Sequence, residues 1–183
     1  MKTVQVKDKL FSEYISESSI KDRVNEVATR MIEDLDGKYP LFLVVLNGSF
    51  VFAADLLRKI QIPCQISFIK LASYDGMNST GNLKQVLGLN EDLEGRTVVV
   101  IEDIIDSGFT MSELLEILKK KHPADIRVAS LLVKPESLKV NIKIDYRCFD
   151  IPNDFIVGYG LDYDGEGRNL PDIYQVAKSG HIN

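Results

Sequence analysis

Three carboxylates lie close together in the sequence, between a β-branched run and a turn of small residues. Glu102, Asp103 and Asp106 follow residues 97–101, and the turn 107–110 (Ser-Gly-Phe-Thr) comes directly after them. Backbone amides of small residues at the start of a helix bind phosphate. Carboxylates beside a phosphate would repel it unless they bind hydroxyl groups or Mg²⁺. The pattern therefore indicates a site for a phosphorylated, hydroxyl-bearing ligand such as a ribose phosphate.

The flanking residues predict a buried strand, a loop and a helix, in that order. The continuous β-branched run 97–101 is typical of a central strand in a parallel sheet. After the turn, apolar residues recur at helical spacing, and Thr110 or Ser112 is expected to cap this helix. Ligands of open α/β sheets bind beyond the carboxyl ends of the strands. The alternative for this segment is an exposed loop start followed by an ordinary turn.

Elsewhere in the chain, apolar runs alternate with helical patterns, which predicts a mainly parallel sheet. Ser19 and Asp22 are expected to form a capping box for an amphipathic helix that reaches Leu35. A second turn, 46–49, separates a predicted strand from a helix predicted at 51–59. The predicted strands are 41–46, 66–69, 98–101, 128–133 and 155–157.

Two common phosphate-binding signatures do not explain this pattern. The Walker string Gly-x-x-x-x-Gly-Lys-Ser/Thr does not occur in the chain. Residues 158–160 (Gly-Tyr-Gly) begin a dinucleotide fingerprint, but Tyr163 stands in place of its third glycine. No strand-to-helix pattern surrounds that segment, so a dinucleotide-binding fold is disfavoured.

Residues 98–110 closely resemble the phosphoribosyl-diphosphate motif of type I phosphoribosyltransferases. Four further segments are similar to the 6-oxopurine branch of that family, the hypoxanthine-guanine phosphoribosyltransferases, and follow in the family's order: 46–49, 73–74, 132–135 and 154–163. The resemblance implies a type I phosphoribosyltransferase fold. This is an α/β fold with a mainly parallel central sheet flanked by helices, and a small hood.

The resemblance also implies an activity in purine salvage. The 5-phosphoribosyl group of phosphoribosyl diphosphate would be transferred reversibly to hypoxanthine and/or guanine, giving IMP or GMP and pyrophosphate, with Mg²⁺ as the cofactor. The implied partners are phosphoribosyl diphosphate, a 6-oxopurine base and the nucleotide product. Relatives form dimers and tetramers, so a homodimer or homotetramer is expected.

In this resemblance, the opening motif has three separate roles. Glu102 and Asp103 would hold the ribose hydroxyls and contribute to the metal site. Asp106 would lie near purine N7 and move a proton there as the catalytic group. The 5-phosphate would be bound chiefly by backbone amides of Asp106, Ser107, Gly108, Phe109 and Thr110. Relatives often carry lysine where Phe109 stands, so its side chain is expected to be dispensable.

The pyrophosphate group would be bound by a second loop. By resemblance, Leu46, Asn47 and Gly48 bind it through backbone amides, with a non-proline cis peptide between Leu46 and Asn47. Many relatives have lysine in place of Asn47, which leaves only the backbone role here. Arg168 matches an arginine of the family that contacts pyrophosphate.

The purine site is also implied by matching positions. Lys134 would donate to the 6-oxygen of the base, Phe155 would stack on its ring, and the backbone of Ile156 would contact its edge. Asp162 would bind Mg²⁺ through water at the same pocket. Without the resemblance, these residues would be interpreted as a solvated strand end, core residues and a loop acid.

Residues 71–82 are polar, contain glycine and are too long for an ordinary connection. By resemblance, Ser73 and Tyr74 belong to a lid that closes over the reacting centre and keeps water out. A disordered insertion or a hairpin tip is the alternative.

Composition agrees with a single phosphoribosyltransferase domain, residues 1–183. With 183 residues and 45% hydrophobic content, one substantial core is expected at about 16–160, with a hood from about 1–15 and 161–183. The net charge of −5 and the absence of a basic run argue against nucleic-acid binding. Cys64 and Cys148 are expected to be reduced thiols, and no apolar run is long enough for secretion or membrane insertion. A cytoplasmic protein is expected.

Two other function classes use the same phosphate motif. One is a regulatory protein of this fold that senses phosphoribosyl diphosphate or a nucleotide and catalyses little; an RNA-binding version should have a basic face. The other is a pyrophosphokinase-type synthase, which would need a longer chain and an ATP site.

Overall fold

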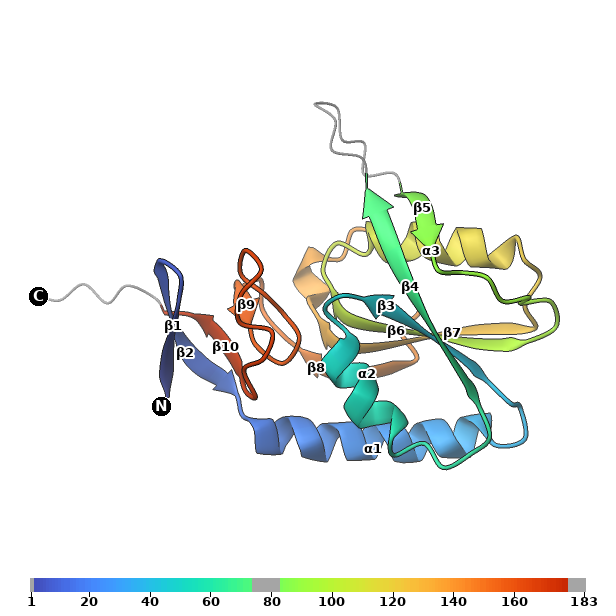
Figure 1. Ribbon diagram of the computed structural model, residues 1–183, viewed down its shortest axis with the longest axis horizontal. Helices are drawn as coiled ribbons and strands as arrows, with labels where there is room; N and C mark the ends of the chain where they lie inside the picture. The colour runs from blue at the N-terminus through green and yellow to red at the C-terminus, as the bar shows by residue number, and fades with distance from the viewer. Residues whose placement is uncertain (1, 74–82, 178–183) are drawn as a thin grey trace, which may run out of the picture.

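The computed structural model describes residues 2–73 and 83–177 (Figure 1). These residues form two sheets, a six-stranded core sheet with helices on both faces and a four-stranded sheet at one end of the molecule. The core elements are α1 (Glu17–Leu35), β3 (Leu41–Leu46), α2 (Phe50–Leu57), β4 (Gln65–Ser73), β5 (Leu83–Leu87), β6 (Thr97–Ile105), α3 (Phe109–Lys119), β7 (Asp125–Val133), the 3₁₀ turn η1 (Pro135–Ser137) and β8 (Tyr146–Asp150).

The core sheet has the order β5-β4-β3-β6-β7-β8, and every neighbouring pair except β4–β5 is parallel. This confirms the predicted mainly parallel α/β sheet. Parallel strands need crossover connections, which α2 and α3 supply after β3 and β6. The antiparallel β5 forms one edge and β8 forms the other, and the sequence patterns predicted neither of these strands.

The central strand β6 explains why its sequence is apolar on both faces. Val99 and Ile101 pack in the cluster that contains the buried residues of α1 and α2, whereas Val98 and Val100 pack in the cluster beneath α3. Figure 1 shows the same layers, with α1 and α2 on one side of the sheet and α3 on the other. A strand covered on both faces has no need of alternating polar residues.

The predicted end of this strand at Ile101 is wrong. β6 continues to Ile105 because it stays paired with β7 as far as Val133. Glu102 and Asp103 are therefore strand residues and not the start of a loop. Because their backbone belongs to the sheet, the positions from which the two carboxylate side chains project are fixed.

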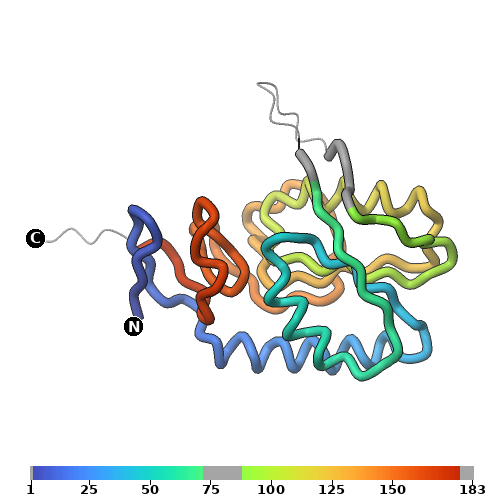
Figure 2. The backbone as a smooth tube through the Cα atoms, in the orientation of Figure 1, coloured from blue at the N-terminus to red at the C-terminus, as the bar shows by residue number. Residues whose placement is uncertain are grey.

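The four-stranded sheet is the hood, with the order β1-β2-β10-β9. Its strands come from both ends of the chain: β1 (Thr3–Val6), β2 (Lys9–Ile15), β9 (Ile156–Val157) and β10 (Ile173–Val176). The tube in Figure 2 shows both ends of the described chain in this part of the molecule, with β2 between β1 and β10. The predicted strand 155–157 therefore lies in the hood and not, as expected, in the core sheet, because Ile156 and Val157 pair with β10.

Two predicted helix starts are also wrong. The capping residue of α1 is Ser16, whose hydroxyl accepts from the Ser19 amide at 3.2 Å, so Ser19 lies inside the helix and no Ser19–Asp22 box forms its start. The helix after the phosphate turn begins at Phe109, with Gly108 at the capping position, so neither Thr110 nor Ser112 caps it. Several serines lie near the start of each helix, and the local sequence does not determine which residue caps it.

Within the described residues, the helices are too short or too polar to cross a bilayer. Cys64 and Cys148 are both free thiols. Burial raises the pKa of the Cys148 thiol to about 12, so this side chain is a neutral part of the core.

Candidate active site

Three adjacent parallel strands deliver the predicted site residues to one edge of the core sheet. β3, β6 and β7 end at Leu46, Ile105 and Val133, and each is followed directly by a predicted site segment. Carboxyl ends of parallel strands meet at the same edge, which is where α/β folds bind ligands. The phosphate turn, the 46–49 loop and Lys134 therefore belong to one region.

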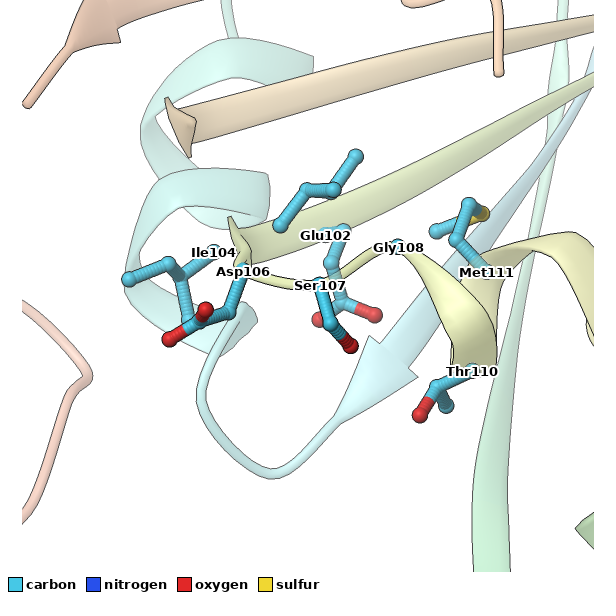
Figure 3. Close-up of a pocket in the computed structure, with 8 residues that line it drawn as sticks. Glu102, Ile104, Asp106, Ser107, Gly108, Thr110 and Met111 are labelled. Carbon is cyan, nitrogen blue, oxygen red and sulfur yellow. The ribbon is translucent and has the colours of Figure 1, made fainter. Parts of the chain in front are cut away.

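The turn after β6 encloses a cavity of about 190 Å³. Its lining is Glu102, Ile104, Ile105, Asp106, Ser107, Gly108, Thr110 and Met111. In Figure 3 the Asp106 carboxylate and the Thr110 hydroxyl lie at opposite ends of the turn. Phe109 is absent from the lining and its side chain is half exposed.

Gly108 gives this turn its shape. Its φ of +82° lies in the left-handed region, where a side chain is unfavourable. A Cβ there would also lie 2.8 Å from the side chain of Val140. A glycine is therefore strongly favoured at this position, where the turn leads into the first amides of α3.

The 46–49 loop packs against the carboxylates of β6. The Leu46–Asn47 peptide is cis, as the resemblance implied. A Cβ added to Gly48 would overlap the carboxylate of Asp103, and one added to Gly160 would overlap the carbonyl oxygen of Gly48. Gly48 thus lies between the Asp103 side chain of β6 and the backbone of the segment after β9, so three distant parts of the chain meet here.

Glu102 and Asp103 are neighbours with little room for two charges. Asp103 donates its backbone amide to the Glu102 carboxylate at 3.1 Å, and its own carboxylate accepts from the Ile104 amide at 2.9 Å. Burial, followed by the hydrogen bond and charge of the Asp103 carboxyl, raises the pKa of Glu102 well above its ordinary value. Hydroxyl donors or a cation would relieve this repulsion.

Lys134 and Asp106 form an ion pair across the turn. Lys134 Nζ lies 2.9 Å from Asp106 Oδ2 and 3.4 Å from Asn153 Oδ1. The lysine is 8% exposed, whereas Asp106 is exposed. A buried ammonium needs such partners, because an unpaired charge in this position would be strongly destabilising.

Phe155 is 47% exposed. Its ring centroid lies 6.3 Å from that of Phe11, 5.6 Å from that of Tyr163 and 5.6 Å from Lys9 Nζ. A partly exposed ring that is held by other aromatic side chains can serve as a platform for a flat ligand.

Asp162 and Arg168 are paired in the segment that follows β9. Their side chains are 2.7 Å apart, and Arg168 also donates to the Gly160 carbonyl at 2.7 Å. The second oxygen of Asp162 accepts from the Gly165 amide at 2.8 Å. Arg168 therefore fixes the shape of the segment that packs on Gly48. Ile156 lies in β9, just before this segment.

Sequence and structure comparisons place this geometry in a known family. The family described as "Phosphoribosyl transferase domain" matches residues 12–164. The chain belongs to the phosphoribosyl transferase family. Its resemblance to the hypoxanthine-guanine branch is confirmed by relatives that carry that name.

Three relatives illustrate the match. The hypoxanthine phosphoribosyltransferase of Buchnera aphidicola is 44% identical over 169 residues, 88% of this chain and 93% of the relative. A crystal structure of the Staphylococcus aureus hypoxanthine phosphoribosyltransferase has a TM-score of 0.86 and 32% identity, covering 94% of each chain. A Bacillus anthracis hypoxanthine-guanine phosphoribosyltransferase has a TM-score of 0.85 and 39% identity, covering 91% of this chain and 98% of its own.

The predicted lid of this phosphoribosyltransferase lies only partly within the described residues. Ser73 is the last residue of β4, and Tyr74 lies outside the described residues. The described strands on either side, β4 and β5, pair antiparallel. The role of Ser73 and Tyr74 as a lid stays a prediction.

The carboxylates of this phosphoribosyltransferase fit Mg²⁺ in chemistry, although they form no compact cage. Among residues 2–73 and 83–177, no group of three or more His, Cys, Asp or Glu side chains could hold a metal by itself. Mg²⁺ ordinarily takes one or two carboxylates and completes its shell with water and substrate phosphates. Glu102 with Asp103, on β6, and Asp162, in the segment after β9, offer oxygen ligands of that kind.

Two contacts were not foreseen from the sequence. Lys9, in the first hairpin, lies over the ring of Phe155, and Asn153 accepts from Lys134. Lys9 carries no local signal, because it is far from Phe155 in the chain and lies in a segment expected only to cover the site. Asn153 does have one signal, since it directly precedes the 154–163 motif.

Proposed function

We propose that this protein catalyses the Mg²⁺-dependent, reversible transfer of the 5-phosphoribosyl group from phosphoribosyl diphosphate to hypoxanthine and/or guanine. The products are IMP or GMP and pyrophosphate, which makes the reaction a step of purine salvage. The observation that carries the proposal is the Lys134–Asp106 pair at 2.9 Å beside the phosphate turn. The names of the relatives support the same substrate class.

The pair matches one edge of a 6-oxopurine. On that edge O6 accepts a hydrogen bond and N7 lies next to it. In the free base N7 can carry a proton, so the edge then presents a donor beside an acceptor. The ammonium of Lys134 donates to O6 and the carboxylate of Asp106 accepts from N7–H. Adenine has an amino group in place of O6, which would face the donors of Lys134.

The remaining groups hold the ribosyl donor. The amides of residues 106–110 and the hydroxyls of Ser107 and Thr110 bind the 5-phosphate, while Glu102 and Asp103 accept from the ribose hydroxyls. The backbone of 46–48, together with Arg168, receives pyrophosphate. Phe155 stacks on the base. This orients the base so that its reacting nitrogen faces C1 of the ribose.

Transfer needs one proton movement by the protein. N9 of the base attacks C1, the bond from C1 to pyrophosphate breaks, and the N7 proton passes to Asp106. In the reverse direction Asp106 returns that proton and the base leaves. Glu102, Asp103 and Asp162 would hold Mg²⁺, which would supply positive charge to offset that of the pyrophosphate group.

The test is a product assay with phosphoribosyl diphosphate, Mg²⁺ and one purine at a time. Hypoxanthine, guanine, xanthine and adenine are compared, and nucleotide and pyrophosphate are both measured. IMP or GMP formation with little AMP is the expected result. If no 6-oxopurine gives nucleotide, the proposal fails, and tight binding without turnover would favour the regulatory alternative.

Replacing Lys134 with alanine is expected to weaken binding of the base selectively. The KM for hypoxanthine should rise about tenfold, because a hydrogen bond from a charged donor to O6 is lost. The KM for phosphoribosyl diphosphate should stay near the wild-type value, since the amides of the phosphate turn are unchanged. An equal rise in both constants would contradict the assignment of Lys134 to the base.

We also propose a homodimer or homotetramer located in the cytoplasm. Apolar side chains exposed on α2 and β4, those of Phe50, Ile66 and Phe68, support an interface between copies of the chain. The two free thiols are typical of proteins in a reducing compartment. The mass of the protein in solution, measured by light scattering, decides between dimer and tetramer, and a monomer would contradict both.

A further inference from the structure

Lys134 has a second partner besides the proposed catalytic carboxylate. Its Nζ donates to Asp106 Oδ2 at 2.9 Å and approaches Asn153 Oδ1 at 3.4 Å. Asn153 follows β8 in the chain and comes two residues before Phe155, the proposed stacking ring. None of the roles discussed above uses this amide.

The backbone just before Asn153 is held to β7. The Ile151 amide donates to the Val133 carbonyl at 2.8 Å, which extends the pairing of β7 with β8 up to the residue before Lys134. Pro152 follows, and its ring fixes φ on the way to Asn153. The amide therefore reaches Lys134 from a braced segment and not from a free loop.

The two partners of Lys134 respond differently to the proposed reaction. When Asp106 takes the N7 proton, its carboxylate becomes neutral and its attraction for the ammonium falls. At that moment Lys134 still has to donate to O6. The amide oxygen of Asn153 does not change its charge, so its hold on the ammonium is the same before and after proton transfer.

We propose that Asn153 is a positioning residue that keeps the ammonium of Lys134 directed at O6 of the base while Asp106 exchanges its proton. A lysine side chain has many rotamers, and a second fixed acceptor reduces the entropy lost when O6 is bound. This inference rests on the proposed transferase function and extends it to a residue that touches neither substrate.

The experiment compares Asn153→Leu, which keeps the size of the side chain and removes the acceptor, with Asn153→Asp, which keeps the accepting oxygen. Asn153→Leu is expected to lower kcat/KM for hypoxanthine about fivefold to tenfold, while the KM for phosphoribosyl diphosphate stays unchanged. Asn153→Asp should restore most of the loss. Asn25→Leu, at an exposed position of α1, is the matched control and should behave as wild type.

Thermal midpoints are measured for all four proteins, so that a loss of folded protein is not mistaken for a loss of positioning. Wild-type kinetics in Asn153→Leu would overturn the inference, as would an equal loss for both substrates or an Asn153→Asp variant no better than Asn153→Leu. Failure of the proposed function itself is a different result, because the wild-type protein would then form no nucleotide.

Discussion

Asp106→Asn should slow phosphoribosyl transfer by roughly 10²-fold or more while the protein stays folded and binds phosphoribosyl diphosphate. Asparagine has almost the same shape as aspartate, so the turn that encloses the phosphate cavity keeps its amides in place. An amide cannot take up the N7 proton, and the base therefore has to attack, or leave, without that proton transfer. The expected loss is in kcat, because the step itself is impaired.

The measurement separates proton transfer from positioning. Asp106 is also the ionic partner of Lys134, so its substitution could act through the lysine alone. In that case the KM for the base would rise and kcat would change little. Calorimetry with phosphoribosyl diphosphate and Mg²⁺ tests whether the phosphate turn is intact, and Asp36→Asn, at the exposed end of α1, is the control. Unchanged kcat in Asp106→Asn would remove the catalytic role.

The core sheet could be predicted from the sequence because its strands have local signatures. The β-branched run at the start of β6 indicated a central strand, and the structure places it between β3 and β7. The end of the strand could not be predicted in the same way. Glu102 and Asp103 look like a loop, and only the distant partner β7 keeps them in the sheet.

The hood was harder to predict because its order depends on contacts between the two ends of the chain. β9 has only two residues, which an apolar pattern cannot distinguish from a core strand. It joins the hood because β10 pairs with it, and β10 in turn pairs with β2. The start of α1 is decided in the same region, since buried Asp172 accepts from the Glu17 amide at 2.8 Å.

The candidate site was predicted where residues are grouped in the sequence and missed where they meet only in space. The phosphate turn is one continuous motif, so its carboxylates and small residues were recognisable together. The pairing of Lys134 with Asp106 joins the ends of two strands, and the contact of Gly48 with Asp103 joins the 46–49 loop to strand β6. Neither pairing has a periodic or compositional signal, so family resemblance supplied the roles and the structure supplied the contacts.

Gly48→Ala is the second substitution for which we expect a large loss, and its reason is steric. A Cβ at this position would overlap the carboxylate of Asp103, which is the end of a short side chain. The carboxylate can swing away, so the free energy of unfolding should fall by only about 1–2 kcal/mol. Once displaced, however, it no longer accepts from the ribose hydroxyls. We expect kcat/KM for phosphoribosyl diphosphate to fall about 10- to 100-fold.

A matched glycine separates this effect from a general cost of alanine. Gly37 has a φ of +73° and open space around it, so Gly37→Ala strains the backbone without touching the site. It should lower stability by about 1 kcal/mol and leave the kinetic constants unchanged. Gly48→Ala should lower the stability by a similar amount and, unlike Gly37→Ala, should also show a large kinetic defect. If its kinetic loss were no greater than that of Gly37→Ala, the close approach of the pyrophosphate loop to Asp103 would have no part in binding the ribosyl donor.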